Sequence, residues 1–341
     1  MSHNYFITGG AGFIGSNYVQ RLLKRGEKVT LYDNLSRAGA PRNLAWLKET
    51  FGDSAFKLVV GDVRDAGLLA VSTREADVII HLAAQVAVTT SVVKPREDFE
   101  INAGGTFNVL EAARLNERKP VVIYASTNKV YGGMDDVRVI EKATRWEYEN
   151  LPFGAPEIQP LDFHSPYGCS KGAGDQYVRD YSRIYDLPTV VMRQSCIYGP
   201  RQFGVEDQGW VAWMVIAAVT GRPLSIYGDG KQIRDLLHVD DLLDAYDAVL
   251  KKKESAKGEV FNLGGGPQNT LSIWTEFGLM LEKLLGKSIP VARGDWRPGD
   301  QKVFVADIRK AEKELGWKPK INVEDGVKML FEWVSANKDL F

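Results

Sequence analysis

The apolar run Tyr5-Phe6-Ile7 leads directly into Thr8-Gly9-Gly10-Ala11-Gly12-Phe13-Ile14-Gly15, and the next apolar run, Lys28 to Tyr32, ends at a carboxylate, Asp33. Between the two runs, residues 16–24 contain neither glycine nor proline and suit a helix. This order predicts a strand, a glycine turn, a helix and a second strand that ends in an acidic side chain.

The glycines of this turn have separate physical tasks. One allows the tight turn, one lets the backbone approach a pyrophosphate, and Gly15 lets the helix pack close to the strand. Phosphates at the amino end of the helix are stabilised by unpaired amide groups and by the positive end of the helix dipole. A glycine turn that only joins a strand to a helix is the alternative. The flanking strand, the helix and Asp33 together favour a dinucleotide-binding turn.

Asp33 indicates which dinucleotide to expect. A carboxylate at this place accepts hydrogen bonds from the adenosine ribose and repels a ribose phosphate, which favours NAD over NADP. Arg37, four positions later, is a contrary feature, because a basic residue could hold a 2′-phosphate. NAD is the cofactor that we expect.

Length and charge exclude several classes of function. A chain of 341 residues is expected to form one large domain or two fused domains. Its net charge is −1, from 43 basic and 44 acidic residues, and the longest basic run, Lys251 to Lys253, is expected to be a solvated helix end. This balance implies no nucleic-acid partner. No apolar stretch is long enough to suggest a membrane span.

The cysteines and histidines indicate which cellular compartment to expect and whether a metal site is expected. The chain has two cysteines, Cys169 and Cys196, and its first strand starts too early to follow a secretory signal segment. These features predict a cytoplasmic protein. The four histidines lie far apart without the spacing of metal ligands, so no metal site is expected.

Apolar runs alternate with helix-period segments over the first two thirds of the chain. Continuous apolar strands separated by helices are typical of a parallel sheet that is covered on both faces, and ligands bind such sheets at the carboxyl ends of the strands. Polar or small residues follow the strands at Asp62-Val63, Leu82-Ala83-Ala84 and Ser126-Thr127. The strands are expected near residues 4–8, 28–32, 56–60, 77–82, 120–126 and 188–193.

The pattern becomes less regular after about residue 194, where Gly and Pro punctuate the chain. We expect a smaller second lobe there, and a return to the first lobe near 234–263, so that both domains are discontinuous. The expected division is a dinucleotide-binding domain of 1–193 and 234–263, and a second domain of 194–233 and 264–341. The segment 132–166 is long for a connection and is either a functional loop or an ordinary solvated loop.

Tyr167-Gly168-Cys169-Ser170-Lys171 places an ammonium one helical turn after a phenol. Such an ammonium is expected to stabilise the phenolate and so to lower the pKa of Tyr167, which would let the tyrosine act as a base. The same spacing recurs at Tyr227-Gly228-Asp229-Gly230-Lys231, but its two glycines favour a turn. Pro166 suits the start of a helix over 167–185, so the first pair is the catalytic candidate. The apolar run from Val121 ends at Thr127, whose hydroxyl could hold a substrate oxygen.

With these motifs, the chain resembles the extended short-chain dehydrogenases/reductases of the nucleotide-sugar epimerase and dehydratase type. Within this family it is most similar to the 2-epimerases that act on CDP-linked hexoses of the paratose and tyvelose type. The family-level motifs are residues 8–15, Asp62-Val63, His81 to Gln85, Asn102, Thr127, Tyr167 with Lys171, and Arg234 to Asp241. The motifs that carry the closer resemblance are residues 126–132, 160–171, 193–204 and 207–213.

The resemblance implies an α/β fold, with a Rossmann-type doubly wound parallel sheet and a smaller C-terminal α/β substrate-binding lobe. It implies that Tyr167, Thr127 and Lys171 are catalytic. The cofactor-binding residues that it implies are Gly9, Gly12, Phe13, Ile14, Gly15, Asp33, Asn34, Ser36, Arg37, Asp62, Val63, Leu82, Ala83, Ala84, Gln85, Asn102, Tyr167, Lys171 and Gln194. The substrate-binding residues that it implies are Lys129, Cys196, Arg201, Tyr227, Arg234 and Arg297, with the two last as pyrophosphate ligands.

Two departures from relatives narrow the reaction. Asn128-Lys129 stands where 4,6-dehydratases carry Asp-Glu after the threonine, which disfavours dehydration, and Cys196 stands where UDP-galactose 4-epimerases have asparagine. The resemblance therefore implies an NAD-dependent epimerase that inverts carbon 2 of a CDP-sugar. A 4-epimerase acting on a UDP-sugar and a non-catalytic NAD-binding regulatory protein are the alternatives. Family members pair through two long helices, so the segments 98–116 and 167–185 predict a homodimer or homotetramer.

Overall fold

A seven-stranded sheet forms the centre of the computed structural model, which describes residues 2–297 and 300–341. The strand order is β12-β8-β5-β4-β1-β2-β3, and the pairs β1–β2, β1–β4, β2–β3 and β4–β5 are parallel. The predicted doubly wound α/β class is confirmed. The strands are β1 (Asn4–Thr8), β2 (Lys28–Asp33), β3 (Lys57–Val60), β4 (Val78–His81), β5 (Val121–Thr127), β8 (Thr189–Gln194) and β12 (Val260–Leu263).

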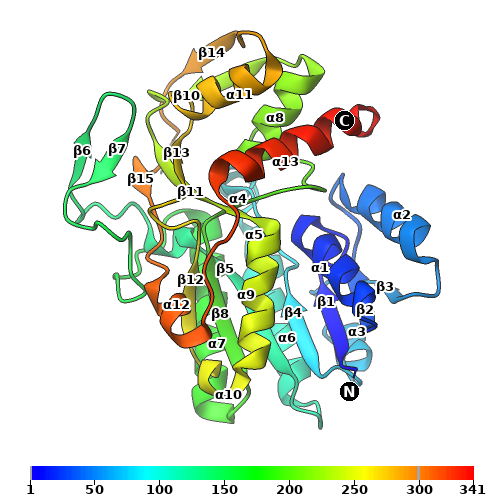
Figure 1. The fold of residues 1–341 in the computed structure, drawn as a ribbon. Helices are drawn as coiled ribbons and strands as arrows, with labels where there is room; N and C mark the ends of the chain where they lie inside the picture. Colours follow the sequence, from blue (N-terminus) through cyan, green and yellow to red (C-terminus); the bar gives the residue numbers. More distant parts are fainter. Residues whose placement is uncertain (1, 298–299) are drawn as a thin grey trace. The chain divides into compact units, whose positions relative to one another are not determined.

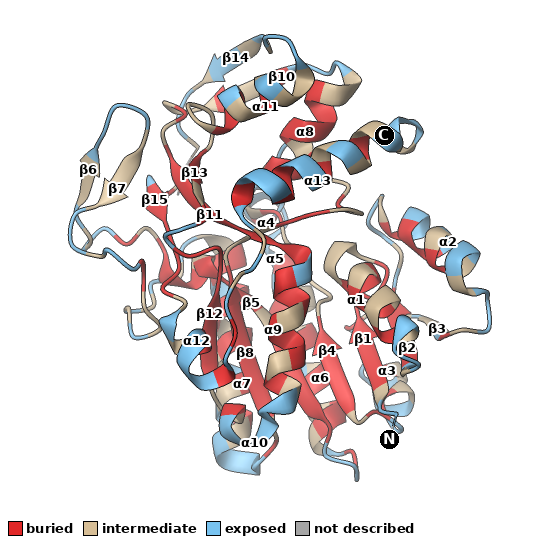
Figure 2. Cartoon of the chain, in the orientation of Figure 1, coloured by how far each residue is buried: buried red, intermediate tan, exposed pale blue. Residues whose placement is uncertain are grey.

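The central strands are buried and rich in apolar residues because both faces of the sheet are covered. All residues of β4, β8 and β12 are buried, and Figure 2 shows the middle of the sheet in the colour of buried residues. The strand order runs one way from β1 to β3 and the other way from β1 to β12, so its direction reverses between β1 and β4 (Figure 1). Ligands of doubly wound sheets bind beyond the carboxyl ends of the strands at such a reversal.

The helices over the first 193 residues match the expected pattern with small shifts at their ends. The helix expected over 167–185 is α7 (Ser165–Tyr185), which starts two residues earlier, and the helix expected over 98–116 is interrupted by a π-helical turn. None of the helices in the described residues is long and apolar enough to cross a membrane. The others are α1 (Phe13–Lys24), α2 (Ala40–Phe51), α3 (Ala66–Ser72), α4 (Val88–Val93), α5 (Pro95–Phe99), η1 (Glu100–Gly104) and α6 (Gly105–Arg114).

The chain divides into two compact units. Unit 1 comprises residues 1–130, 165–193 and 246–261, and unit 2 comprises residues 131–164, 194–245 and 262–341. In this division the segments 131–164 and 234–245 belong to unit 2, whereas the sequence-based division assigned them to the dinucleotide-binding domain. β11 (Ile233–His238) pairs with strands of unit 2, namely β9, β13 and β15. The expected domain boundaries stay a prediction.

Unit 2 contains short strands and a hairpin that the sequence did not predict. The hairpin, β6 (Val139–Glu141) and β7 (Trp146–Tyr148), lies in the segment 132–166. Arg145 anchors it by hydrogen bonds of 2.7 and 2.6 Å to the carboxylate of Glu276, and the Trp146 indole donates to Asp229. The remaining elements are η2 (Asn128–Tyr131), β9 (Cys196–Tyr198), β10 (Leu224–Tyr227), β13 (Thr270–Ser272), β14 (Val291–Gly294), β15 (Val303–Phe304), α9 (Val239–Lys251) and α10 (Lys253–Ala256).

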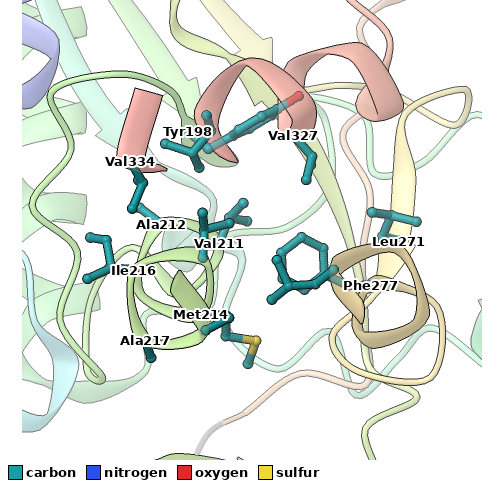
Figure 3. Close-up of a cluster of buried hydrophobic side chains, with 14 of the residues drawn as sticks. Tyr198, Val211, Ala212, Met214, Ile216, Ala217, Leu271, Phe277, Val327 and Val334 are labelled. Carbon is teal, nitrogen blue, oxygen red and sulfur yellow. The ribbon is translucent and has the colours of Figure 1, made fainter. Parts of the chain in front are cut away.

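The apolar core of unit 2 lies between three helices, α8 (Trp210–Thr220), α11 (Phe277–Leu285) and α13 (Val323–Ala336). Val211 and Ile216 of α8, Phe277 of α11 and Val327 of α13 are among its buried members (Figure 3). Trp210 and Trp213 are half-buried against this core, as expected for aromatic residues at helical spacing. The last helices are α12 (Arg309–Leu315) and η3 (Lys338–Leu340).

We predict that Gly15→Ala destabilises the protein. A Cβ at Gly15 would lie 2.3 Å from the carbonyl oxygen of Gly9 and 2.7 Å from Cα of Gly10, and a backbone neighbour cannot yield easily. Overpacking of this kind costs about 1–3 kcal/mol, so the thermal unfolding midpoint should fall. Gly104→Ala is the matched control, because its Cβ would meet only Phe99 O, at 3.9 Å, and its φ is −63°. An unchanged midpoint for Gly15→Ala would show that the turn relaxes.

Candidate active site

The glycine turn between β1 and α1 is built by close backbone contacts. Gly9 has a φ of +67°, and a Cβ there would lie 2.8 Å from the amide nitrogen of Ala83 in the loop after β4. Thr8 strengthens the same junction, since its hydroxyl accepts hydrogen bonds from the amides of Leu82 and Ala83 at 3.1 and 3.2 Å. The turn and the loop after β4 are therefore fixed to each other.

Gly12 has the geometry expected of a phosphate-binding position. It is the N-cap residue of α1, makes no side-chain cap, and is followed by a first turn without acidic residues. A Cβ at Gly12 would meet one atom of the described residues within 4 Å, the Gly9 carbonyl oxygen at 3.1 Å. The backbone at Gly12 leaves room for a ligand to approach closely. Because glycine has no side chain, no side chain at this position caps the first amides of α1. Phe13 and Ile14 form that first turn.

Asp33, at the end of β2, is held against the glycine turn. Its carboxylate accepts hydrogen bonds from the amides of Ala11 at 3.0 Å and of Leu35 at 2.8 Å. Burial raises the pKa of Asp33, and the two backbone hydrogen bonds lower it. Each carboxylate oxygen keeps acceptor capacity for a further donor, such as a ribose hydroxyl.

The neighbouring predicted cofactor residues form a second polar group at the ends of β2 and β3. Asn34 donates to Asp62 at 2.9 Å, and Arg64 donates to both oxygens of Asp62, which holds the pKa of that carboxyl well below its usual range. Ser36 and Arg37 are exposed after β2, and Val63 is buried.

Asn102 lies in the π-helical turn η1 and locks the loop after β4. Its side-chain oxygen accepts from the amide of Gln85 at 2.9 Å, and its side-chain nitrogen donates to the carbonyl of Gln85 at 2.9 Å. It also donates to the hydroxyl of Ser170 on α7 at 3.1 Å. Single π-helical turns are frequent at functional sites. Asn102 thus positions the Leu82–Gln85 loop and α7.

The three predicted catalytic residues lie together in unit 1. Tyr167, in the first turn of α7, is buried, and the hydroxyl of Thr127 at the end of β5 acts on its phenol by lowering its pKa. The amide of Tyr167 donates to the hydroxyl of Ser91 at 3.2 Å. Lys171, one turn later, is also buried. Its ammonium donates to the carbonyl of Ala125 at 2.6 Å and lies 4.2 Å from the centre of the Tyr124 ring.

The electrostatics of this cluster differ from the expectation. Burial raises the pKa of Tyr167 to about 12, although the hydrogen bond with Thr127 lowers it. Burial also lowers the pKa of Lys171 to about 7, against the charges of Asp175 and Asp98. The expectation that the Lys171 ammonium lowers the pKa of Tyr167 was wrong for this structure, because burial dominates and the ammonium donates to the Ala125 carbonyl.

A buried ion pair that the sequence analysis missed holds these elements together. Arg193 of β8 donates two hydrogen bonds of 2.9 Å to the carboxylate of Asp175, with side chains 2% and 0% exposed. Ser126 donates to the same carboxylate at 2.8 Å. Asp175 therefore joins α7 to the ends of β5 and β8. The available signal was its place four residues after Lys171, on the same face of the helix.

The predicted substrate-binding residues of unit 2 fall into separate groups. Arg297 lies 4.0 Å above the ring of Tyr227 and forms an ion pair of 3.4 Å with Asp207. Arg234 is buried and donates to Asp300 at 2.6 Å. The other members have different contacts. Arg201 lies over the ring of Trp333, and Cys196 accepts from the Trp210 indole. Gln194, which was predicted to bind the cofactor, is buried at the end of β8.

Lys129 lies in unit 1, two residues after Thr127. Its amide donates to the hydroxyl of Thr127 at 3.2 Å. Across residues 2–297 and 300–341, no cluster of three or more His, Cys, Asp or Glu side chains is placed to hold a metal ion.

Comparison with known proteins gives matches over nearly the whole chain. The chain is 44% identical to CDP-paratose 2-epimerase from Salmonella typhi over 337 residues, which cover 97% of this chain and 98% of that protein. Two solved structures share the fold. One is the dTDP-glucose 4,6-dehydratase DesIV of Streptomyces venezuelae with NAD bound (TM-score 0.84, 31% identity, 99% and 98% of the two chains). The other is UDP-glucose 4-epimerase of Thermotoga maritima with UDP-glucose (TM-score 0.83, 29% identity, 98% and 99%).

A protein-family model also matches most of the chain. The model described as GDP-mannose 4,6 dehydratase matches residues 6–330, which include the glycine turn, the Tyr167–Lys171 pair and both units. With this match and a whole-chain relative at 44% identity, the chain belongs to the GDP-mannose 4,6 dehydratase family, among the extended short-chain dehydrogenases/reductases whose motifs its sequence carries.

Proposed function

We propose that the protein is an NAD-dependent epimerase that inverts carbon 2 of a CDP-linked hexose of the paratose and tyvelose type. The observation that carries this proposal is the whole-chain similarity to a CDP-paratose 2-epimerase, with Thr127, Tyr167 and Lys171 gathered at one place in unit 1. Asn128-Lys129, in place of the Asp-Glu of the dehydratases, supports epimerisation over loss of water.

NAD fits the residues of unit 1. The glycine turn leaves space at Gly12 for a pyrophosphate, the start of α1 presents amides, and Asp33 has acceptor capacity for ribose hydroxyls. A related structure from Streptomyces was solved with NAD. The chemistry that NAD supplies is to accept a hydride from the sugar carbon and return it to the same carbon.

The side chains of the catalytic cluster carry out the proton transfers. Burial raises the pKa of Tyr167 to about 12, so Tyr167 must first lose its own proton; as the phenolate it takes the proton of the sugar hydroxyl, and it returns that proton when the carbonyl is reduced. Thr127, at the end of β5, orients the sugar oxygen. Lys171 supplies positive charge next to the reacting groups. The resulting keto sugar presents its other face before reduction, so the alcohol is inverted without net oxidation.

The remaining assignments rest on the resemblance. Arg234 and Arg297 are proposed to bind the diphosphate, since planar guanidinium groups suit such oxyanions. Lys129, Cys196, Arg201 and Tyr227 are proposed to contact the substrate, and Gln194 the cofactor. The cytoplasmic compartment stays a prediction, supported by the free thiols of both cysteines.

Tyr167→Phe should lower kcat/KM for epimerisation by about 10²–10⁴-fold, because it removes the group that transfers the proton. Epimers have the same mass, so this loss is measured by proton NMR or by chromatographic separation of the epimeric products from a panel of CDP- and UDP-sugars. Tyr185→Phe removes a hydroxyl from an exposed tyrosine at the other end of α7 and should leave activity unchanged. Equal activity of wild type and Tyr167→Phe would rule out the tyrosine mechanism.

The same reaction in deuterated water tests the route. Internal hydride return predicts no solvent deuterium at the inverted carbon, whereas incorporation would indicate enolisation. A product inverted at carbon 4 of a UDP-sugar would favour the 4-epimerase alternative.

Gly12→Ala should separate cofactor binding from folding. The added methyl would lie 3.1 Å from Gly9 O and otherwise extend into the space proposed for the pyrophosphate. We expect the purified variant to carry far less NAD, measured by chromatography of nucleotide released on heating, with a thermal midpoint near that of the nucleotide-free wild type. Retention of NAD at the wild-type level would contradict the assigned phosphate position.

We further propose that the protein forms homodimers, or homotetramers built from them, through α6 and α7. Phe107 of α6 and Tyr177 of α7 are 42% and 49% exposed and pack edge to face, with ring centres 5.9 Å apart. Ile184 and Tyr185 extend this apolar surface along α7. Exposed apolar patches of this kind mark interaction surfaces.

Phe107→Arg should break this association, because it places a charge within the apolar surface. Light scattering coupled to size-exclusion chromatography should show the monomer mass. Ile158→Arg, at a residue of unit 2 that is 90% exposed, is the control and should keep the wild-type mass. A Phe107→Arg protein with unchanged mass would refute this interface.

A further inference from the structure

A buried carboxylate, Asp98, lies beside the catalytic turn of α7 and has no role in the reaction as described so far. It is 1% exposed and belongs to the short helix α5. Its Oδ1 accepts hydrogen bonds from the side-chain nitrogens of Gln85 at 2.9 Å and Asn102 at 3.1 Å, and its Oδ2 accepts from the hydroxyl of Ser170. A carboxylate with three donors in a buried place is well satisfied.

The three donors come from three different segments. Gln85 belongs to the loop after β4, Asn102 to η1, and Ser170 to α7, directly before Lys171. Ser170 is also bonded to Asn102 at 3.1 Å. Since all three groups donate, the side chain at this position has to accept with both of its terminal atoms. An ionised carboxylate can do this, whereas an amide has one terminal NH₂ group that only donates. Asp98 therefore connects the loop after β4 with the turn that carries the catalytic pair.

The charge of Asp98 acts on both catalytic groups. It raises the pKa of Tyr167 and the pKa of Lys171. Burial raises the pKa of Asp98, and the hydrogen bonds of Ser170 and Gln85 and the charge of Lys171 oppose this rise.

The other titratable groups that face Tyr167 and Lys171 do not supply the same negative charge as Asp98. Asp175, on α7, also acts on Lys171, but its carboxylate is paired with Arg193. His81, on β4, is neutral because burial, with the charge of Lys171, lowers its pKa to about 3. Tyr124, on β5, has a pKa raised well above its usual value by burial. Asp98 is bonded only to neutral donors in the contacts above, so its charge reaches the pair without a salt-bridge partner.

We propose that Asp98 is a positioning residue for the epimerase reaction: it locks the first turn of α7 through Ser170 and Asn102, and it holds a fixed negative charge beside Tyr167 and Lys171. This inference rests on the proposed function. It adds that the negative charge of Asp98 influences the ionisation of Tyr167 and Lys171 at the same site. In the contacts above, Asp98 does not touch the phenol of Tyr167 or the ammonium of Lys171. It therefore acts on the reaction through Tyr167 and Lys171, which are among the proposed catalytic residues.

Asp98→Asn tests the charge. Removing it lowers the pKa of both Tyr167 and Lys171, so both limbs of the pH profile of kcat should move to lower pH by about 0.5–1 pH unit. A residue with only a structural role would reduce kcat by the same factor at every pH. Asp180→Asn is the control, because it removes an exposed carboxylate from α7, the helix that carries Tyr167 and Lys171, and should leave the limbs in place. Unshifted limbs in Asp98→Asn would overturn the proposal.

Ser170→Ala tests whether the hydrogen bonds of Ser170 position the start of α7. It also provides a test of the proposal if the Asp98→Asn protein does not fold. The substitution removes the hydrogen bonds of the Ser170 hydroxyl with Asp98 and Asn102 and keeps the charge of Asp98, so kcat should fall at least about fivefold without a shift of the pH limbs. KM for the CDP-sugar should stay within twofold. A wild-type kcat in this variant, or limbs displaced as in Asp98→Asn, would contradict the proposal.

A readout without substrate separates this inference from the proposed function. The ionisation of Tyr167 is followed by tyrosinate absorbance, as the difference between each protein and its Tyr167→Phe counterpart. Tyr167 should ionise at lower pH in Asp98→Asn than in wild type. If wild type acts on no CDP-sugar but this shift is seen, the proposed function fails and the effect of Asp98 stands. If the phenol titrates identically in both proteins, the inference fails whatever the substrate.

Discussion

The ion pair between Asp175 and Arg193 is the interaction on which the arrangement of the proposed catalytic residues depends. Both side chains are removed from water, so each charge needs the other, and breaking such a buried pair costs about 3–5 kcal/mol. The geometry is bidentate, and Ser126 supplies a further donor. Since these groups come from α7, β8 and β5, the pair fixes the helix of Tyr167 against the strand that ends in Thr127.

A second constraint acts at the glycine turn. The backbones of β1, α1 and the loop after β4 approach so closely at Gly9 and Gly15 that a methyl group fits at neither position. The same loop continues to Gln85, which is bonded to Asn102 and Asp98. Steric crowding at one end of the loop and a polar cluster at the other therefore connect the dinucleotide turn to the catalytic turn within unit 1.

Much of this arrangement could be predicted because it follows from local patterns. The glycine spacing, the acidic end of β2 and the apolar strands determine backbone conformation within a few residues of themselves, and the predicted strands are found with shifts of one or two residues. The hairpin of β6 and β7 could not be predicted, because three-residue strands carry too little periodicity. Contacts with Glu276 and Asp229, far away in sequence, hold it in place.

By itself, the sequence determined the α/β class, the family, the dinucleotide turn and the pairing of Tyr167 with Lys171 on one helical face, because each depends on the spacing of neighbouring residues. Only the tertiary structure decided the electrostatics of that pair. Burial sets the pKa of both residues, the carbonyl of Ala125 determines where the ammonium donates, and Asp98, 72 residues before Ser170, adds its charge. Desolvation and charge act through space, and spacing along the chain does not encode them.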